Sequence, residues 1–127
     1  MDDRLYEQGL ERRRKIHGDA FVDRALEAKN FGDADFQRFV TEYCWGAAWS
    51  QDGASLHERS LIALGMFAAR NQYDEFRLHC RGLLRNGYSA TSLLSLARQI
   101  AVYCGVTVGI SCHGIILEVI EESQAPG

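Results

Sequence analysis

The sequence predicts an all-α protein, a compact bundle of roughly six to seven helices. Apolar residues recur three and four positions apart through most of the chain, which is the spacing of one helix face. No segment alternates apolar and polar residues over the length of a strand, and Pro126 is the only proline. Because 127 residues suffice for one core, we expect a single domain over residues 1–127.

Three helices are expected in the first half of the chain. The first covers residues 3–16 and stops before Gly18. Asp19 can cap a second helix over residues 20–29, and residues 30–33 read as a turn. A third helix follows and runs to about residue 49.

The third helix is expected to begin at Asp33 or Asp35. Trp45 and Trp49 lie four residues apart and share a face of it. Two large aromatic side chains on one face predict a place in the core or in a subunit interface.

The fourth helix is expected from about residue 56 to residue 70. Ser55 and Glu58 have the spacing of a capping box, in which each side chain satisfies a backbone N–H of the first turn. The helix is apolar on most faces, so we expect it in the centre of the fold.

The remaining helices are expected at residues 72–85, 91–103 and 106–121. Ser89 is expected as a cap, and Asn86-Gly87 and Cys104-Gly105 are expected as stops.

Composition excludes several classes of protein. The net charge is -3, from 14 basic and 17 acidic residues. This balance gives no support for a basic surface that binds nucleic acid. The basic cluster at residues 12–15 is expected on a solvated or subunit-facing surface. No apolar run is long enough to span a membrane, and the acidic N-terminus lacks the apolar stretch of a signal peptide.

Cysteine usage predicts reduced thiols in a cytoplasmic protein. The four cysteines lie in apolar helical stretches and include no Cys-x-x-Cys pair. The adjacent pairs His79-Cys80 and Cys112-His113 lack the spacing of zinc ligands, so we expect no metal site.

The candidate site lies in residues 55–79, where polar side chains flank the apolar fourth helix. Glu75 and His79 are four residues apart and share a face, while His57 and Arg59 lie in the first turn of the preceding helix. If the two sets meet, an arginine that clamps a carboxylate and histidines that move a proton suit an anionic small molecule. Alternatively, Glu75 and His79 are a surface pair, and Arg59 is an internal ion-pair partner.

A series of short motifs resembles the gamma-carboxymuconolactone decarboxylase branch of the carboxymuconolactone decarboxylase family. The resemblance covers about residues 5–105 in order and without large gaps. The motifs are Gly18-Asp19-Ala20, Val22-Asp23-Arg24, Leu26-Glu27, Phe36-Gln37, Trp45-Gly46, Trp49, His57-x-Arg59-Ser60-Leu61-Ile62, Leu78-His79-x-Arg81, Asn86-Gly87 and Tyr103-Cys104-Gly105.

The resemblance implies an alkyl hydroperoxidase D-like fold without thiol peroxidase chemistry. The wider superfamily uses a glutamate, a Cys-x-x-Cys pair and a histidine. Here the glutamate position is Ser60, the cysteine positions are Gln72 and Glu75, and the histidine is His79. Because both thiols are absent, the peroxidase reaction has no nucleophile.

The resemblance also implies a carboxy-lyase that needs no cofactor. It would decarboxylate gamma-carboxymuconolactone, or a similar anionic lactone, in the beta-ketoadipate pathway of aromatic-acid catabolism. The reaction needs an oxyanion partner, a carboxylate clamp and a proton donor. The implied roles are His57 and His79 for oxyanion stabilisation or proton delivery, Glu75 for orientation or relay, Arg59 for charge binding, and Tyr43 and Trp45 for the substrate wall.

Departures from the family pattern keep other functions open. The sixth helix starts with Thr91-Ser92 where acidic residues are usual, Val106-Thr107 replaces a common proline, and Tyr43 replaces a frequent histidine. The alternatives are an isomerase or hydrolase acting on another lactone or keto acid, and a non-catalytic oligomeric scaffold. Family members form rings, so we expect a homo-oligomer, a trimer or hexamer, with the tryptophans of the third helix near an interface.

Overall fold

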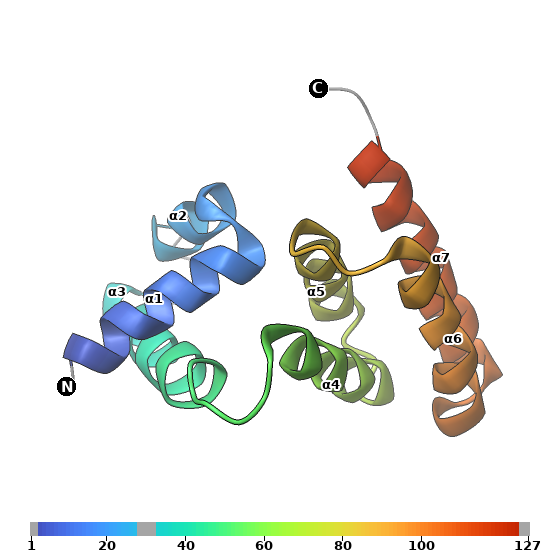
Figure 1. Ribbon diagram of the computed structural model, residues 1–127, viewed down its shortest axis with the longest axis horizontal. Coiled ribbons are helices and arrows are strands. Elements are labelled where there is room, and N and C mark those ends of the chain that lie inside the picture. Colours follow the sequence, from blue (N-terminus) through green and yellow to red (C-terminus); the bar gives the residue numbers. More distant parts are fainter. Residues whose placement is uncertain (1–2, 28–32, 125–127) are drawn as a thin grey trace. The chain divides into compact units, whose positions relative to one another are not determined.

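The computed structural model describes residues 3–27 and 33–124, and these residues fall into two compact units. The N-terminal unit comprises Met1–Leu56 and the C-terminal unit comprises His57–Gly127, and each is described by itself. The described residues form seven α-helices and one π-helical segment, with no strand among them (Figure 1). The predicted all-α class is therefore confirmed.

The N-terminal unit follows the predicted helix boundaries where it is described. Asp33 caps α3, because its carboxylate accepts a hydrogen bond of 2.9 Å from the backbone N–H of Phe36. The end expected for the second helix and most of the expected turn at residues 30–33 lie outside the described residues. The elements of this unit are α1 (Asp3–His17), α2 (Asp19–Glu27), α3 (Ala34–Val40) and the π-helix η2 (Thr41–Trp49).

The expected third helix changes from α to π geometry at Thr41. Its hydroxyl donates a hydrogen bond of 2.8 Å to the backbone carbonyl of Gln37, four residues back. The side chain thus competes for a carbonyl that the regular helix ladder uses. The sequence predicts an ordinary α-helix here, because no cap or stop marks a change to the wider turns of a π-helix.

Helices α1 and η2 pack backbone against backbone. A Cβ atom added at Gly9 would come within 3.0 Å of the backbone of Thr41 and Gly46, and one added at Gly46 would come within 3.0 Å of the Leu5 carbonyl. Only glycine allows two helix backbones to approach this closely.

One member of the basic cluster is buried, which corrects the expectation of a solvated surface. Arg13 is 7% exposed, and its Nη1 donates hydrogen bonds to Gln37 Oε1 at 2.9 Å and Thr41 Oγ1 at 3.1 Å. Burial lowers the pKa of Arg13 from its ordinary value. The pattern of charges could not reveal this, because the acceptors are neutral side chains 24 and 28 residues away.

The C-terminal unit also agrees with the predicted boundaries, and its last helix runs three residues beyond the expected end. Ser89 caps α6 by accepting a hydrogen bond from the Ser92 N–H at 3.3 Å, and Gly105 ends that helix with a φ of 104°. The helices are α4 (Leu56–Ala69), α5 (Tyr73–Arg85), α6 (Ala90–Cys104) and α7 (Val106–Gln124).

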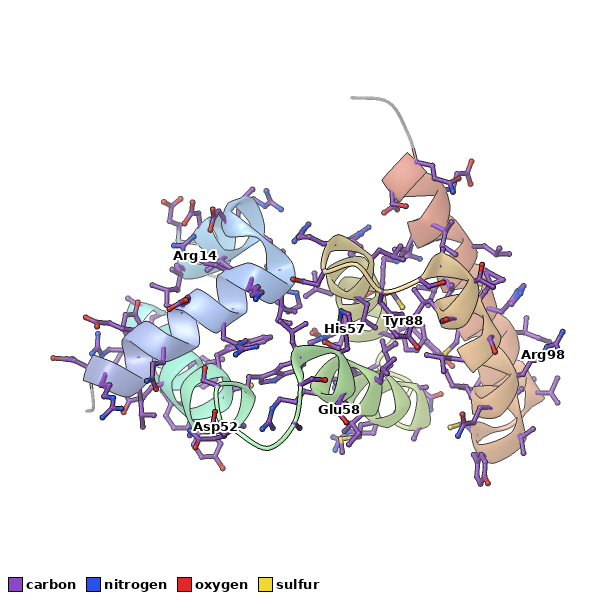
Figure 2. The ribbon with its side chains drawn as sticks, viewed as in Figure 1. Arg14, Asp52, His57, Glu58, Tyr88 and Arg98 are labelled. Atoms are coloured by element: carbon purple, nitrogen blue, oxygen red, sulfur yellow. The ribbon has the colours of Figure 1, made fainter. Side chains whose placement is uncertain are left out.

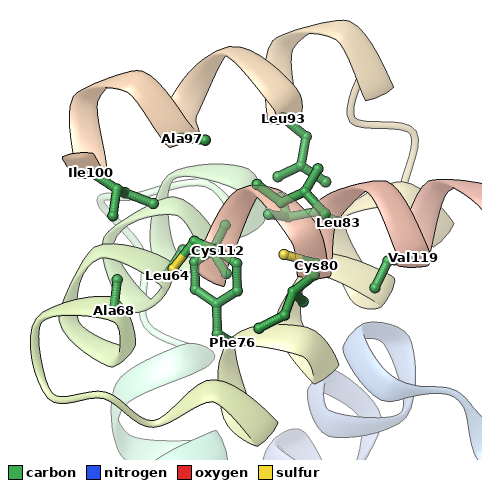
Figure 3. Packing of buried hydrophobic residues seen from close by; sticks show 12 residues of the cluster. Leu64, Ala68, Phe76, Cys80, Leu83, Leu93, Ala97, Ile100, Cys112 and Val119 are labelled. Carbon is green, nitrogen blue, oxygen red and sulfur yellow. The ribbon is translucent and has the colours of Figure 1, made fainter. Parts of the chain in front are cut away.

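The core of the C-terminal unit is made of apolar side chains from α4, α5, α6 and α7 (Figure 3). Phe76 and Leu83 of α5 are fully buried, and Cys80 and Cys112 fill space among them as free thiols. Burial raises the pKa of Cys80 to about 12 and that of Cys112 to about 11. Both sulfurs therefore stay protonated and act as small apolar groups.

The expectation that the fourth helix lies in the centre of the fold is wrong. Only one face of α4 is buried, at Ser60, Leu64 and Ala68. Ile62 and Met66 on its other faces are 62% and 59% exposed. A central place in the fold would require neighbours on every side of α4, and the helices of this unit cover only one side of it.

None of the described helices is long and apolar enough to span a membrane.

Candidate functional site

His57 lies in the first turn of α4 and is held by the segment that follows α5. Its Nε2 is 2.8 Å from the backbone carbonyl oxygen of Asn86. The ring of Tyr88 meets the imidazole edge to face, with centroids 5.5 Å apart and an interplanar angle of 77° (Figure 2). The ring is half-buried. One imidazole of the candidate set is therefore anchored and still reaches the surface.

His79 lies in the middle of α5 and is 5% exposed. Its ring packs against Phe67 of α4, with centroids 5.1 Å apart. Burial lowers the pKa of His79 from its ordinary value of 6.5 to about 4, because desolvation disfavours the charged form. This imidazole is neutral near pH 7, so it can donate or accept a hydrogen bond but does not carry a positive charge.

His57 of α4 contacts the residue that ends α5, whereas His79 lies in the middle of α5. His79 precedes Asn86, the partner of His57, by seven residues, which is about 10 Å along a helix axis. Glu75 lies a further turn away, exposed in the first turn of α5. Among the described residues it has neither a hydrogen bond nor an ion pair. The contact that His57 makes with the end of α5 therefore lies apart from His79 and from Glu75 along that helix.

Arg59 follows His57 by two residues in α4, a spacing at which two side chains leave a helix on different sides. Arg59 is half-buried, and its Nε is shielded from solvent. The guanidinium is therefore partly withdrawn from water, which strengthens its attraction for a carboxylate.

Ser60, at the position of the superfamily's glutamate, is a further candidate, for which the sequence predicts no role. It lies one turn beyond His57, so both side chains share a face of α4. Ser60 is 1% exposed, and its hydroxyl has no hydrogen-bond partner among the residues that the structure describes. A buried hydroxyl left unsatisfied costs about 1–3 kcal/mol, so a ligand or water that pairs with it gains affinity.

Tyr43 and Trp45 belong to η2 in the N-terminal unit. Trp45 is 5% exposed, and its ring lies against His17 at 5.2 Å and Trp49 at 4.8 Å. Of the two places left open for the tryptophans, core or interface, Trp45 occupies the core of its own unit. Tyr43 is 66% exposed and stacks on Phe39 at 5.4 Å.

Sequence signals for the groups that hold His57 are weak. Asn86 and Gly87 predict the end of α5, and the structure confirms this with a Gly87 φ of 87°. Neither residue indicates that a carbonyl at this helix end meets an imidazole 29 residues earlier.

Among the described residues, no group of three or more histidine, cysteine, aspartate or glutamate side chains is arranged to hold a metal ion.

The chain is similar to known decarboxylases. Residues 34–109 match the model of the Carboxymuconolactone decarboxylase family. The 4-carboxymuconolactone decarboxylase of Acinetobacter baylyi is 32% identical over 121 residues, which cover 95% of this chain and 87% of that protein. The nitrosuccinic acid decarboxylase npaB of Metarhizium robertsii is 31% identical over 102 residues, covering 80% of this chain and 71% of that protein. These similarities confirm the predicted resemblance and, at the level of the family, the carboxy-lyase class.

Proposed function

Because this chain belongs to the carboxymuconolactone decarboxylase family, we propose that it decarboxylates gamma-carboxymuconolactone, or a closely similar unsaturated lactone acid, without a cofactor. The observation that carries the proposal is the 32% identity to the Acinetobacter baylyi enzyme over 95% of the chain. A role in aromatic-acid catabolism in the cytoplasm, by the beta-ketoadipate pathway, is part of the same proposal.

The proposed reaction sets three tasks for the site. When carbon dioxide leaves, the electron pair of the broken bond spreads onto the carbonyl of the conjugated lactone. A hydrogen-bond donor must stabilise the resulting oxyanion, a cation must hold the remaining carboxylate, and an acid must protonate the carbon. The candidate residues include a group suited to each task.

We assign the roles by burial. His57, half-buried and anchored, delivers the proton. His79 is buried and neutral, which suits a hydrogen-bond donor to the oxyanion and does not suit an acid. Arg59 binds the remaining carboxylate through its fork of N–H donors. Glu75 remains a candidate for orientation or relay.

A second candidate is a decarboxylase for a different acid. The relative that is named a nitrosuccinic acid decarboxylase, 31% identical over 80% of this chain, supports it. A nitro group, like a lactone carbonyl, accepts the electron pair that carbon dioxide leaves behind. The family scaffold therefore suits acids whose departing carboxylate lies next to an electron-accepting group.

The test is a parallel assay of carbon dioxide release by the purified protein from freshly prepared gamma-carboxymuconolactone and from nitrosuccinic acid. The first proposal predicts rapid release from the lactone without any added cofactor. Release from nitrosuccinic acid alone would favour the second candidate. A folded protein that released carbon dioxide from neither acid would contradict both, and would turn the search to an isomerase, a hydrolase or a scaffold.

We also propose that the protein is a homo-oligomer. The support is an apolar surface on the C-terminal unit, where Val102, Tyr103 and Ile110 are 78%, 82% and 65% exposed. Beside them α4 and α6 line a groove of about 460 Å³ that includes Ile62 and Tyr103. Exposed apolar patches of this kind mark protein interfaces.

Light scattering tests the assembly. We expect the mass of a trimer or hexamer for the wild type and a smaller mass for Ile110→Glu. Arg85→Glu, an exposed change at the end of α5 in the same unit, is the matched control and should keep the wild-type mass. A wild-type monomer at micromolar concentration would contradict the proposal.

A further inference from the structure

The contact between His57 and Asn86 fixes the position of a proton. A backbone carbonyl oxygen only accepts hydrogen bonds, so the Nε2 atom 2.8 Å from it must carry a hydrogen. In a neutral imidazole with hydrogen on Nε2, the other nitrogen, Nδ1, carries the free lone pair. Among the described residues, Nδ1 of His57 has no hydrogen-bond partner. The ring therefore has one nitrogen committed to the protein and one open to a ligand.

The Asn86 carbonyl is held by the end of α5. The backbone N–H of Asn86 donates to the carbonyls of Gly82 at 3.0 Å and Leu83 at 3.2 Å, and its side-chain Nδ2 donates to the same Gly82 oxygen at 2.8 Å. Gly87 then takes a φ of 87°, which returns the chain so that the Tyr88 N–H reaches the Leu83 carbonyl at 2.9 Å. The acceptor for His57 is thus part of a rigid helix cap.

Tyr88 provides a second restraint from the same cap. Its half-buried ring lies 5.5 Å from the imidazole centroid at an angle of 77° (Figure 2). An edge-to-face contact of this kind depends on the orientation of both rings. Turning the imidazole would break both this contact and the hydrogen bond to Asn86.

We propose that residues 86–88 form a positioning element that holds His57 with Nε2–H on the Asn86 carbonyl and leaves Nδ1 as the nitrogen that exchanges a proton with the substrate. The proposal for Nδ1 rests on the proposed decarboxylase function. Asn86 and Tyr88 act through His57 and are positioning residues.

The proton balance of the step is simple. The bond between the substrate carbon and its carboxylate breaks, carbon dioxide leaves, and the electron pair passes into the lactone carbonyl. The resulting enolate carbon takes a proton from Nδ1–H of protonated His57, while Nε2–H stays on the Asn86 carbonyl. Nδ1 then takes a proton from water, so one proton is consumed for each carbon dioxide released.

His79 offers no comparable arrangement. It is 5% exposed against Phe67, and its pKa of about 4 keeps it uncharged near pH 7. Of the two histidines proposed for the site, only His57 combines a committed nitrogen with a surface-accessible ring.

The direct test is the tautomer of His57, measured by two-bond ¹H–¹⁵N correlation on the ¹⁵N-labelled protein without substrate. The signals are assigned by their loss in His57→Gln. At a pH where His57 is neutral, we expect the pattern of a single form with hydrogen on Nε2. Hydrogen on Nδ1, or an averaged mixture of both forms, would overturn the proposal.

Tyr88 variants separate positioning from general stability. Tyr88→Phe keeps the ring edge and should keep the Nε2–H pattern and the wild-type kcat. Tyr88→Leu should give a mixed tautomer pattern and lower kcat by roughly tenfold or more with little change in KM. An unchanged pattern and unchanged kcat in Tyr88→Leu would count against a role for Tyr88.

The two proposals fail in different ways. A wild-type protein with the Nε2–H pattern but no release of carbon dioxide from any acid would contradict the proposed function and still support the positioning of His57. An active enzyme with hydrogen on Nδ1 would support the proposed function and contradict the positioning of His57.

Discussion

The two units of the molecule bury different kinds of polar group. In the N-terminal unit the closest packing joins two helix backbones at Gly9 and Gly46, and a buried arginine spans the helices through neutral acceptors. In the C-terminal unit, apolar side chains such as Phe76 and Leu83 make the core, and the two candidate histidines lie at its edge and within it. Both units also bring helices close together at glycine, because a Cβ added at Gly109 of α7 would lie 2.8 Å from the Ala101 Cα. The difference is that the N-terminal unit buries an arginine, whereas the C-terminal unit buries a histidine that burial keeps neutral near pH 7.

The largest expected effect is on the glycine contact. Gly9→Ala and Gly46→Ala should each destabilise the protein by about 3 kcal/mol or more, because the new methyl meets backbone that cannot move aside. Gly114→Ala in α7 is the matched control, since a Cβ there meets nothing within 4 Å. It should gain up to about 1 kcal/mol from helix propensity. Equal thermal unfolding of all three variants would contradict the close backbone contact at Gly9 and Gly46.

The buried histidine of the C-terminal unit should make stability depend on pH. The pKa of His79 is about 4 in the folded protein and ordinarily 6.5, so below pH 6.5 the unfolded chain binds more protons. Stability is therefore highest above pH 6.5 and falls as the pH drops toward 4, by about 3 kcal/mol in total from this group.

Urea unfolding at a series of pH values checks the effect. His79→Gln should lose this part of the slope between pH 6.5 and 4. His113→Gln, an exposed histidine of α7, makes the same chemical change and should keep the wild-type slope because His79 is still present. A wild-type slope in His79→Gln would contradict the assignment.

A smaller effect is expected for the buried arginine of the N-terminal unit. Gln37→Leu removes one of the two side-chain acceptors of Arg13 and should cost about 1–3 kcal/mol, since the buried, charged Nη1 then keeps only the hydroxyl of Thr41 as a side-chain acceptor. Gln8→Leu, at an exposed position of α1, is the control and should stay within about 0.5 kcal/mol of the wild type. Chemical denaturation of both variants gives the comparison.

The smallest effect is expected for the exposed ion pairs between α5 and α7. Glu122 lies 3.0 Å from Arg81, which lowers its pKa, and Glu118 lies 2.7 Å from Arg77. Glu118→Gln and Glu122→Gln should each change stability by less than about 1 kcal/mol, and less still at high salt. A larger, salt-independent loss would mean that these pairs contribute to the core of the unit.

Local signals predicted most helix boundaries, because caps and stops act within a few residues. Asp33, Ser89, Gly87 and Gly105 all fulfil the roles that the sequence assigns to them. The π-helix was not predictable, because the residues from Thr41 onward carry no local signal, such as a cap or a stop, that marks a change from α to π geometry. The exposure of Ile62 and Met66 was missed because hydropathy does not say how many neighbours a helix has.

The sequence proposes the residues of the candidate site, and it contains no signal for their geometry. The motif around His57 and the histidine of α5 indicated which side chains are candidates for the site. Their separation along α5, the carbonyl of Asn86 and the edge of Tyr88 depend on how α4 meets the end of α5. The sequence contains no local signal for that arrangement, and the burial that makes His79 neutral depends on it as well.

The most direct test of the proposed function compares carbon dioxide release by the wild type, His57→Gln and His113→Gln. With fresh gamma-carboxymuconolactone and no added cofactor, we expect rapid release by the wild type and by His113→Gln. His57→Gln should be slower by roughly a hundredfold or more while unfolding at the same temperature. Release by His57→Gln at the wild-type rate would contradict the claim that this histidine delivers the proton.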